Sequence, residues 1–370
     1  MEIKIKTLTP LWTGGIDGTM ERVHEASIIG SLRWWYEAIV RGLGKYACEG
    51  PGGQKCELTG ERLQEFKKSR QNGMDWWTAL DQAQTRQDRE ENRPGICDGC
   101  KVFGTTGWQR RFRLEVVDDT RPIWTPGDRM LNVRPPGRNR GWYLPPGRMG
   151  TLTLHVDGDG RSLSLLATLF LFLEQWGGIG AKPQLGYGVF EIENREEVQA
   201  WAGGWEWKSM GIQDANDTLP DLRRFGFFRH RFSPDLPGWW TRVPGIERVA
   251  SKVQPLVSRY GTVPVSPALK NEWRFHRWRG SKQDERKIFG ALRPDRRRSK
   301  VAVSWAYRVE QEWEVRGWAW LSPRRLADRT WNLLTDQAGW KASLRVVGEL
   351  KTLRLGTREQ VVALLEGKDD

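Results

Sequence analysis

Long apolar runs are absent from this sequence. No stretch of about 18 consecutive apolar residues occurs, which excludes a membrane-spanning helix of ordinary length. The first residues, MEIKIK, also lack the apolar segment of a signal peptide. We therefore expect a cytoplasmic protein without a membrane partner.

Acidic residues are too few to balance the basic ones. The chain has 59 Lys and Arg residues against 46 Asp and Glu residues, which gives a formal net charge of +13. Each phosphate that a cation neutralises releases a condensed counterion, so this balance favours a polyanionic partner. Charge alone does not separate RNA from DNA or anionic lipid, and a basic surface without a specific partner has the same composition.

Tryptophan, in contrast, is abundant, with 22 residues. Many stand beside Arg or Gly, as in the segments 32–35 (LRWW) and 273–278 (WRFHRW). Aromatic faces and guanidinium planes stack on unpaired bases. Burial as a core or interface anchor is the commoner role of a tryptophan, so both roles stay open for each residue.

The first half alternates between strand and helix periodicity. Residues 2–9 alternate apolar and polar side chains, and residues 28–43 have the apolar spacing of an amphipathic helix, capped near Ser27 or Ser31. Further strands are expected at 112–117, 150–156 and 187–192, with a buried helix at 163–176. Strand, helix, strand, strand, helix, strand is the order of a ferredoxin-like unit, whose helices cover one sheet face and leave the other available.

The second half repeats this order. Strands are expected at 225–232, 301–309, 314–321 and 343–350, and helices at 266–279 and 324–335. The segment Lys101–Gly104 (KVFG) before an Arg-rich stretch is echoed by Lys287–Gly290 (KIFG) before another, which indicates diverged copies.

The fold class expected from these patterns is α+β, with two tandem ferredoxin-like (RRM-like) domains and a cysteine-bearing insertion in the first. The domain boundaries are 1–195, with the insertion at about 44–100 and an irregular loop at 121–150; a linker, 196–220; and a second domain, 221–370. The loop 121–150 is rich in Pro and Arg, a composition typical of a loop or extended arm and not of a core.

The four cysteines form two pairs, Cys48 with Cys56 and Cys97 with Cys100. The two-residue gap of the second pair suits a tetrahedral ion, so the set predicts a structural zinc site in a cytoplasmic protein. Free thiols and a redox pair remain alternatives. Lys45, Lys55 and Lys101 stand nearby and are expected to help neutralise a tetrathiolate.

Two glycine-rich segments are candidates for phosphate binding. Residues 177–188 let backbone N–H groups approach a phosphate and add the charge of Lys182, although a purely structural turn has the same composition. Residues 14–33 lead into the first helix, whose N-terminus is a natural anion site. Arg22 and Arg33 are candidates for a phosphate clamp, and Asp17 and His24 for acid–base residues. Ordinary polar contacts are the commoner role of such lone residues.

Four segments carry a resemblance to a known family: 9–15 (TPLWTGG), 27–35 (SIIGSLRWW), 97–108 (CDGCKVFGTTGW) and the glycine-rich loop that ends at 185–188 (LGYG). They resemble the RAMP superfamily and, within it, the first-numbered Cmr subunit of type III-B CRISPR effector complexes.

The resemblance implies two ferredoxin-like domains, contact with the 3′ part of the guide crRNA and with target RNA, other effector subunits as partners, and a role in antiviral defence. It also implies that a different, repeated subunit cleaves the target. Cleaving relatives carry an aspartate before the first helix, where Asp17 lies. Backbone subunits carry a thumb-like hairpin at the place of 121–150, whose Pro-Pro-Gly sequences are unlike a regular hairpin.

The leading hypothesis is therefore a non-catalytic RNA-binding subunit. Its rivals are a metal-independent endoribonuclease that uses Asp17 or His24, and an adaptor whose tryptophans anchor neighbouring subunits. The residues expected to bind RNA are Gly14, Gly15, Arg22, His24, Ser27, Gly30, Ser31, Arg33, Arg110, Arg111, Arg113, Gly178, Lys182, Gln184, Gly186 and Tyr187.

Overall fold

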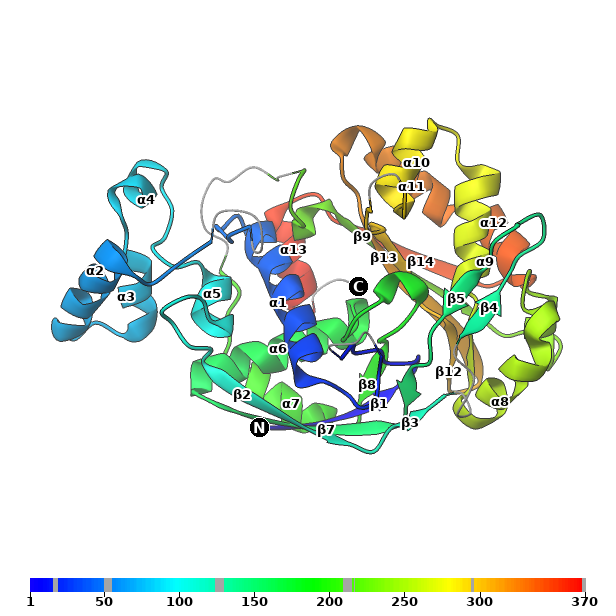
Figure 1. The fold of residues 1–370 in the computed structure, drawn as a ribbon, viewed down its shortest axis with the longest axis horizontal. Coiled ribbons are helices and arrows are strands. Elements are labelled where there is room, and N and C mark those ends of the chain that lie inside the picture. The colour runs from blue at the N-terminus through cyan, green and yellow to red at the C-terminus, as the bar shows by residue number, and fades with distance from the viewer. Residues whose placement is uncertain are drawn as a thin grey trace.

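The computed structural model describes residues 1–15, 19–49, 55–123, 130–208, 215, 217–293 and 296–367. The fold is mixed α+β, with two main antiparallel sheets and helices packed between and around them (Figure 1). The coarse fold class expected from the sequence is thus confirmed. Within the described ranges, no helix is long and apolar enough to cross a bilayer.

The first sheet has the strand order β2-β7-β1-β8. Its strands are β1 (Glu2–Thr7), β2 (Phe112–Asp118), β7 (Thr151–Gly158) and β8 (Phe190–Ile192). In β1, Ile3 and Ile5 are fully buried while Lys4 and Lys6 are exposed, as the alternating sequence predicts. The helices α1 (Glu25–Gly42) and α6 (Gly160–Trp176) cover the apolar face.

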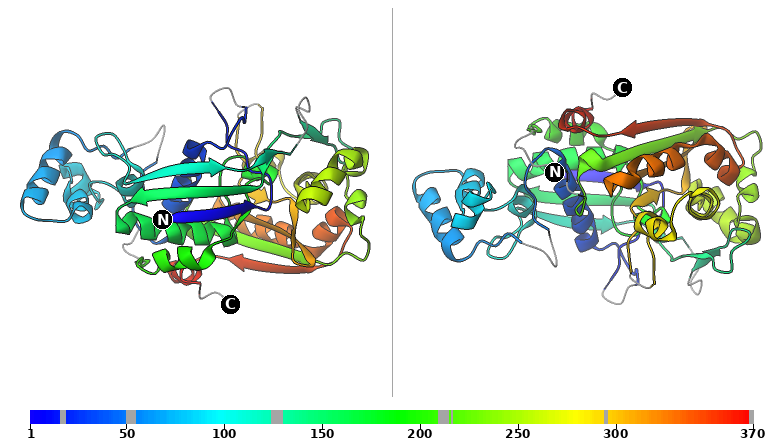
Figure 2. Two further views of the ribbon diagram at one scale, coloured as in Figure 1. Left: turned by 90° about the horizontal axis from the view of Figure 1, so that it is seen from below. Right: turned by 90° about the horizontal axis from the view of Figure 1, so that it is seen from above.

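The open face of this sheet carries charged side chains that pair with one another. Lys6 lies 2.6 Å from Glu191, and Arg113 lies 2.7 Å from Glu115. The outward positions of the four strands hold no Trp, Tyr or Phe. Figure 2, left, shows this sheet across the front of the molecule, with no helix over it. The face therefore lacks the aromatic platform on which an RNA-recognition sheet stacks bases.

The second sheet has the order β10-β12-β13-β9-β14, with β11 also paired to β13. Its strands are β9 (Phe225–Phe232), β10 (Thr262–Val263), β11 (Val301–Val303), β12 (Ala306–Val309), β13 (Glu312–Trp320) and β14 (Glu349–Arg354). One face packs on α9 (Ser266–Asn271), the π-helix Glu272–Arg277, α11 (Arg324–Thr335) and α12 (Gln337–Leu344). Phe228 there contacts Trp273 and Trp340, with ring centroids 6.0 and 5.7 Å away.

The other face of the second sheet is covered by the first half of the chain. The ring of Trp318 on β13 lies 5.5 Å from that of Trp34 and 5.3 Å from that of Trp35, both on α1. Phe225 on β9 lies 5.6 Å from Trp35. The expectation that each sheet leaves a face available is therefore wrong for the second sheet, because apolar residues on both faces of β9 require cover on both sides.

Several elements match the sequence-based expectation, notably β9 and α11, whose bounds agree residue for residue. The prediction of a last strand at 343–350 is wrong in its bounds, since residues 343 and 344 belong to α12 and the strand begins at Glu349. Asp336 caps α12 by accepting from the backbone N–H of Ala338, 3.1 Å away, and the helix buries Trp340 and Leu344. Burial on a helix face outweighed the alternating pattern of 343–350.

Helix boundaries show further differences. The residue before α1 is His24, and Ser31 donates instead to the carbonyl oxygen of Ile28, so neither Ser27 nor Ser31 caps the helix. The helix at 266–279 changes to π geometry after Asn271. The helices that were not expected include α7 (Arg195–Ala202), which lies almost wholly in the expected linker, α8 (Ala250–Tyr260) and α13 (Arg358–Leu365).

The segment 121–150 contains two short ladders. β3 (Arg121–Pro122) pairs with β6 (Arg148–Met149), and β4 (Leu131–Val133) pairs with β5 (Trp142–Leu144). Leu131, Val133 and Leu144 are buried in the core of the second half. The expectation of a loop without core residues is therefore wrong for the hairpin of β4 and β5, because these three apolar side chains pack it against the second half of the chain.

The cysteine-bearing insertion stands at one end of the molecule (Figures 1 and 2). It contains α2 (Gly60–Gln71), α3 (Trp76–Gln82) and α4 (Arg86–Glu90), and it returns to the first sheet through α5 (Asp98–Phe103). Its small core consists of the four cysteines with Leu58, Leu80, Ala83 and Ile96.

Candidate nucleic-acid groove

A groove of about 2450 Å³ runs between the two halves. Its described lining includes fifteen Lys and Arg residues and only two acidic residues, Asp217 and Glu285. Twelve of these cations come from the second half of the chain, and three, Arg138, Arg140 and Lys182, from the first. Cations that face one another across a groove raise its positive potential and attract a polyanion.

One wall is the glycine-rich loop 177–188. Its backbone is held from the first half, where the N–H of Gly180 donates to Ser31 Oγ, 3.1 Å away, and the N–H of Ala181 donates to the carbonyl of Trp12, 2.8 Å away. From the second half, Ser266 Oγ and Trp305 Nε1 both donate to the carbonyl of Leu185, at 2.8 and 2.9 Å.

Gly186 in this loop has φ +92°, and a Cβ there would lie 2.5 Å from the ring of Trp305. Only glycine fits this close approach. Lys270 also donates to the loop, at the carbonyl of Gln184, and to the carbonyl of Val301, 3.0 Å away. Burial lowers the pKa of Lys270 to about 7. The glycine-rich loop is thus held by hydrogen bonds from both halves of the chain and joins them.

A second part of the lining runs from α10 (Lys282–Phe289) to β11. Ser281 caps α10 by accepting from the N–H of Asp284, 3.1 Å away. Beyond the helix, the side chains of Arg293, Arg296 and Arg298 are exposed. Within the described ranges they make no ion pair, so their charge is available to a ligand.

Aromatic side chains complete the lining. Trp34, Trp176 and Trp320 are partly exposed there. Lys300 Nζ lies 4.0 Å from the ring centroid of Trp320, and burial lowers the pKa of this lysine to about 8. The groove therefore combines cations with aromatic faces, the combination that binds single-stranded nucleic acid.

Half of the residues expected to bind RNA line this groove: Ser27, Gly30, Ser31, Gly178, Lys182, Gln184, Gly186 and Tyr187. Two of them are engaged within the protein. Lys182 Nζ lies 3.5 Å from the ring centroid of Trp12, and its pKa is lowered by burial. The hydroxyl of Tyr187 is buried and donates to the carbonyl of Pro145, 2.6 Å away.

The other half lie outside the groove lining: Gly14, Gly15, Arg22, His24, Arg33, Arg110, Arg111 and Arg113. Arg33 donates to Glu37 (2.8 Å), to the carbonyl of Gly104 (3.0 Å) and to Cys100 Sγ (3.2 Å). Arg111 pairs with Asp159, 3.2 Å away. These arginines are bound to protein groups in the structure.

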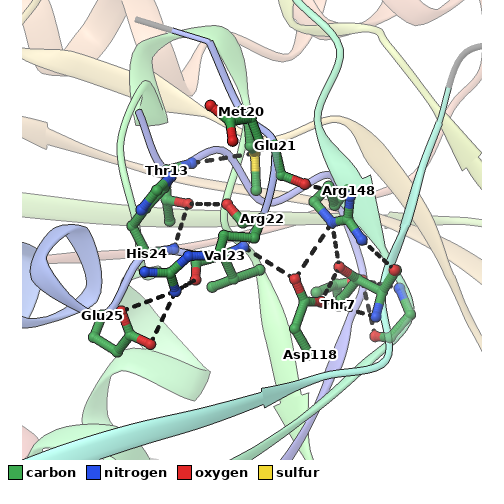
Figure 3. Close-up of polar contacts among 12 residues, drawn as sticks. Thr7, Thr13, Met20, Glu21, Arg22, Val23, His24, Glu25, Asp118 and Arg148 are labelled. Atoms are coloured by element: carbon green, nitrogen blue, oxygen red, sulfur yellow. Dashed lines mark hydrogen bonds and ion pairs between the residues drawn. The ribbon is translucent and has the colours of Figure 1, made fainter. Parts of the chain in front are cut away.

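The loop before α1 is fixed by a polar network around Asp118, at the end of β2 (Figure 3). Asp118 accepts from the N–H of Val23 at 3.0 Å and lies 3.5 Å from Arg148, which in turn donates to the carbonyl of Glu21 at 3.0 Å. Arg22 pairs with Glu25 at 3.1 Å. Arg22 and Arg33, the two residues expected to form a phosphate clamp, thus each have a carboxylate partner of their own.

Of the two acid–base candidates, Asp17 lies outside the described residues. His24 donates through its backbone N–H to Thr13 Oγ1, 2.9 Å away, and its Nε2 is buried without a hydrogen-bond partner in the described structure. It does not face the groove.

The sequence interpretation missed the cations of the second half. Arg286, Arg293, Arg296 and Arg298 line the groove, together with Lys282. A signal was present, because basic residues are dense between Arg279 and Lys300. Without the fold, that segment has the same composition as a solvated surface loop.

The four cysteines meet in the insertion. Cys48, Cys56, Cys97 and Cys100 are buried, and their Sγ atoms all lie within 4.8 Å of one another. Zn²⁺ is bound at about 2.3 Å by four thiolates in a tetrahedron, so sulfurs at this spacing fit the ion. The backbone N–H of Cys97 donates to Cys56 Sγ, 3.3 Å away, as outer-shell donors do around thiolates. The set could hold a metal.

The cation beside these thiols is Arg33 and not Lys101. Lys101 is fully buried, but its ammonium binds Asp98 (2.8 Å) and Asp81 (2.5 Å). Lys45 also binds Asp98, 3.2 Å away. The expected neutralisation of the thiolates by Lys45 and Lys101 is therefore wrong, because carboxylates take up both charges.

Comparison with known proteins finds similarity both to a family and to solved structures. The sequence model of the RAMP superfamily matches residues 4–191. Among solved structures, the chain is similar to the apo form of Cmr1 from Pyrococcus furiosus, with 14% identity and a TM-score of 0.43 over 96% of this chain and 98% of that chain. No curated protein sequence matches.

Proposed function

The chain belongs to the RAMP superfamily, whose sequence model covers about half of it, and from this premise we propose that it is a non-catalytic RNA-binding subunit of a type III CRISPR effector complex. Its RNA ligands are the 3′ part of the guide crRNA and the target RNA, and its protein partners are the other effector subunits of a Cmr-type, type III-B assembly. Both RNA strands are polyanions, so the subunit needs a cationic surface of suitable shape.

The observation that carries the proposal is the charge of the groove, with fifteen basic and two acidic side chains in its described lining. The open face of the first sheet offers no such surface, since its Lys6 and Arg113 are paired with carboxylates. The groove also holds partly exposed aromatic rings such as Trp34 and Trp320. RNA phosphates therefore lie along the arginine wall, with unpaired bases toward the rings.

The proposed architecture is two ferredoxin-like units. In the first sheet the strands pair in the order second, third, first, fourth (β2-β7-β1-β8), and β12-β13-β9-β14 repeats that order in the second. A duplicated unit accounts for both sheets, and the groove forms where the two units meet.

The proposed metal is one structural Zn²⁺ bound by the four cysteine thiolates of the insertion. Their burial and mutual distances support it. The ion would fix Cys56, Cys97 and Cys100 beside Cys48 and so join the insertion to the first unit.

The proposed lack of catalysis rests on the groove itself. The one described acid–base candidate, His24, does not line the groove. Proton transfer to or from a ribose needs a poised acid–base side chain within hydrogen-bond reach. The two groove lysines whose pKa is lowered toward neutrality are engaged by the protein: Lys270 donates to the carbonyls of Gln184 and Val301, and Lys300 donates to the carbonyl of Ser322.

A matched pair of double variants tests RNA binding. Arg296→Gln/Arg298→Gln removes two exposed groove cations, and Lys67→Gln/Lys68→Gln removes two exposed cations of α2, in the distant insertion. For single-stranded RNA, the slope of log K against log salt should fall by about 0.7 for each phosphate that the groove variant no longer neutralises. The slope should stay unchanged in the α2 variant.

Equal slopes in the two variants would refute the groove as the RNA site. Cleavage of the RNA by the purified chain in the presence of EDTA would favour the endoribonuclease instead. Absence of any salt-dependent RNA binding by the wild-type protein would favour the adaptor.

A further inference from the structure

The hairpin β4–β5 and the π-helix Glu272–Arg277 meet inside the groove. The guanidinium carbon of Arg138, in the hairpin connection, lies 3.7 Å from the ring centroid of Phe275, which is 37% exposed. Trp142 on β5 approaches the same ring edge-on, with centroids 6.3 Å apart. Arg138, Trp142 and Phe275 all line the groove.

Arg138 forms no ion pair within the described structure. Its Nε is buried without a hydrogen-bond partner. Arg274, a neighbouring cation, is paired with Glu285 at 2.5 Å. Burial and the charge of Arg274 lower the pKa of Arg138, and Glu285 opposes this shift without reversing it. The group that supports the guanidinium is the ring of Phe275.

The guanidinium carbon of Arg138, 3.7 Å from the ring centroid of Phe275, is well within cation–π distance and in direct contact with the ring. A guanidinium supported in this way presents its outer face and its remaining N–H donors to the groove. Guanidinium planes stack on unpaired bases, and their N–H groups donate to phosphate oxygens. π-helical turns recur at functional sites, and here the turn places Phe275 at the surface.

We propose that Arg138, supported by Phe275, is a stacking platform for one unpaired nucleobase of a single strand in the groove. The inference rests on the proposed function, since it requires RNA in the groove, and it adds a base-binding position to a surface otherwise described by charge. A base inside a duplex is stacked on its neighbours, so the platform selects an unpaired base.

The test separates the plane of Arg138 from its charge. Arg138→Lys keeps the charge but loses the plane, and Phe275→Leu removes the support. Each variant should bind single-stranded RNA of about 12 nucleotides about 5- to 160-fold more weakly, the range that one stacked base is worth. The salt slope should stay at the wild-type value, because the number of neutralised phosphates is the same in both variants.

A spectroscopic readout accompanies the affinities. The RNA carries 2-aminopurine in place of each base in turn, and stacking quenches its fluorescence. At least one position should be quenched by the wild-type protein, by Phe275→Tyr, which keeps a flat ring, and by Trp201→Leu, which alters an exposed aromatic residue on α7, outside the groove lining. That quenching should be lost in Arg138→Lys and Phe275→Leu.

Wild-type affinity and quenching in Arg138→Lys would overturn the platform while leaving the groove intact as the RNA site. The same holds if Phe275→Tyr loses quenching as fully as Phe275→Leu. If the wild-type protein binds no RNA, the proposed function fails, and the platform fails with it.

Discussion

Replacing Arg33 by Gln distinguishes a phosphate-binding arginine from one that secures the cysteine site. In the structure Arg33 donates to Glu37, to the carbonyl of Gly104 and to Cys100 Sγ. It therefore joins α1 to the end of α5, next to the four thiols. Its side chain is 31% exposed and that of Glu37 only 13%, so the pair is mostly shielded from water.

The expected loss of stability follows from the groups that Arg33→Gln leaves without a hydrogen-bond partner. Burial raises the pKa of Glu37, and hydrogen bonds from Arg33 oppose that rise. Hydrogen bonds to charged groups are worth about 1.5–3 kcal/mol each, and solvent screening reduces this value here. We expect Arg33→Gln to lower the free energy of unfolding by about 2–3 kcal/mol and to reduce the zinc content, with no change in the salt slope of RNA binding.

Urea unfolding, metal analysis and RNA titration across a salt series measure the three quantities. The double variant Arg33→Gln/Glu37→Gln serves as a control, because removing both charges should recover some of the stability. The reasoning is refuted if Arg33→Gln keeps full stability and full zinc content while its salt slope falls by about 0.7, the value for one phosphate.

Three further predictions concern pH, metal and catalysis. Burial against Trp340 lowers the pKa of His230 to about 4 from 6.5. The free energy of unfolding should therefore fall by about 3 kcal/mol in total as the pH falls from about 6.5 to 4, because the neutral imidazole must then be protonated. Urea unfolding of His230→Phe should lack this part of the pH dependence. Purified protein prepared without chelator should contain about one equivalent of zinc, and Cys97→Ser should contain less than half; less than half in the wild type would count against the site. Asp17→Ala in a reconstituted effector complex should leave the number and the rate of target cuts unchanged. In-line attack depends largely on how the target strand is positioned, and a non-catalytic subunit does not position the strand for cleavage. Loss of one specific cut, with assembly intact, would favour the endoribonuclease.

The local patterns of the sequence were sufficient for most strands of the two main sheets and for the helices α1, α6, α9 and α11. Alternation in 2–9 and 225–232 and helical spacing in 324–335 report which side of each element is buried, and burial is what forms these elements. The four cysteines were also identified without the fold, since few other functions need two thiol pairs in such a chain. Their convergence was a prediction that the structure confirms.

Competition between neighbouring elements was decided by tertiary packing. The sequence of residues 343–344 is compatible with a strand or a helix. The structure has a helix there because α12 buries Trp340 and Leu344 on one face. The hairpin of β4 and β5 likewise depends on apolar contacts with a half of the chain that follows it in sequence.

The net charge, the abundance of aromatic residues, the two sets of alternating elements and the thiol pairs can all be read without the fold, because each is a property of composition or of neighbours along the chain. The places where the positive charge is available to a ligand depend on the folded chain. The fold paired Arg33 with Glu37, and Arg113 with Glu115, while it placed Arg293, Arg296 and Arg298 in the lining of the groove that the glycine-rich loop also lines. Whether an arginine meets a carboxylate of its own chain or remains available to a phosphate depends on contacts between residues far apart in sequence, which local patterns do not encode.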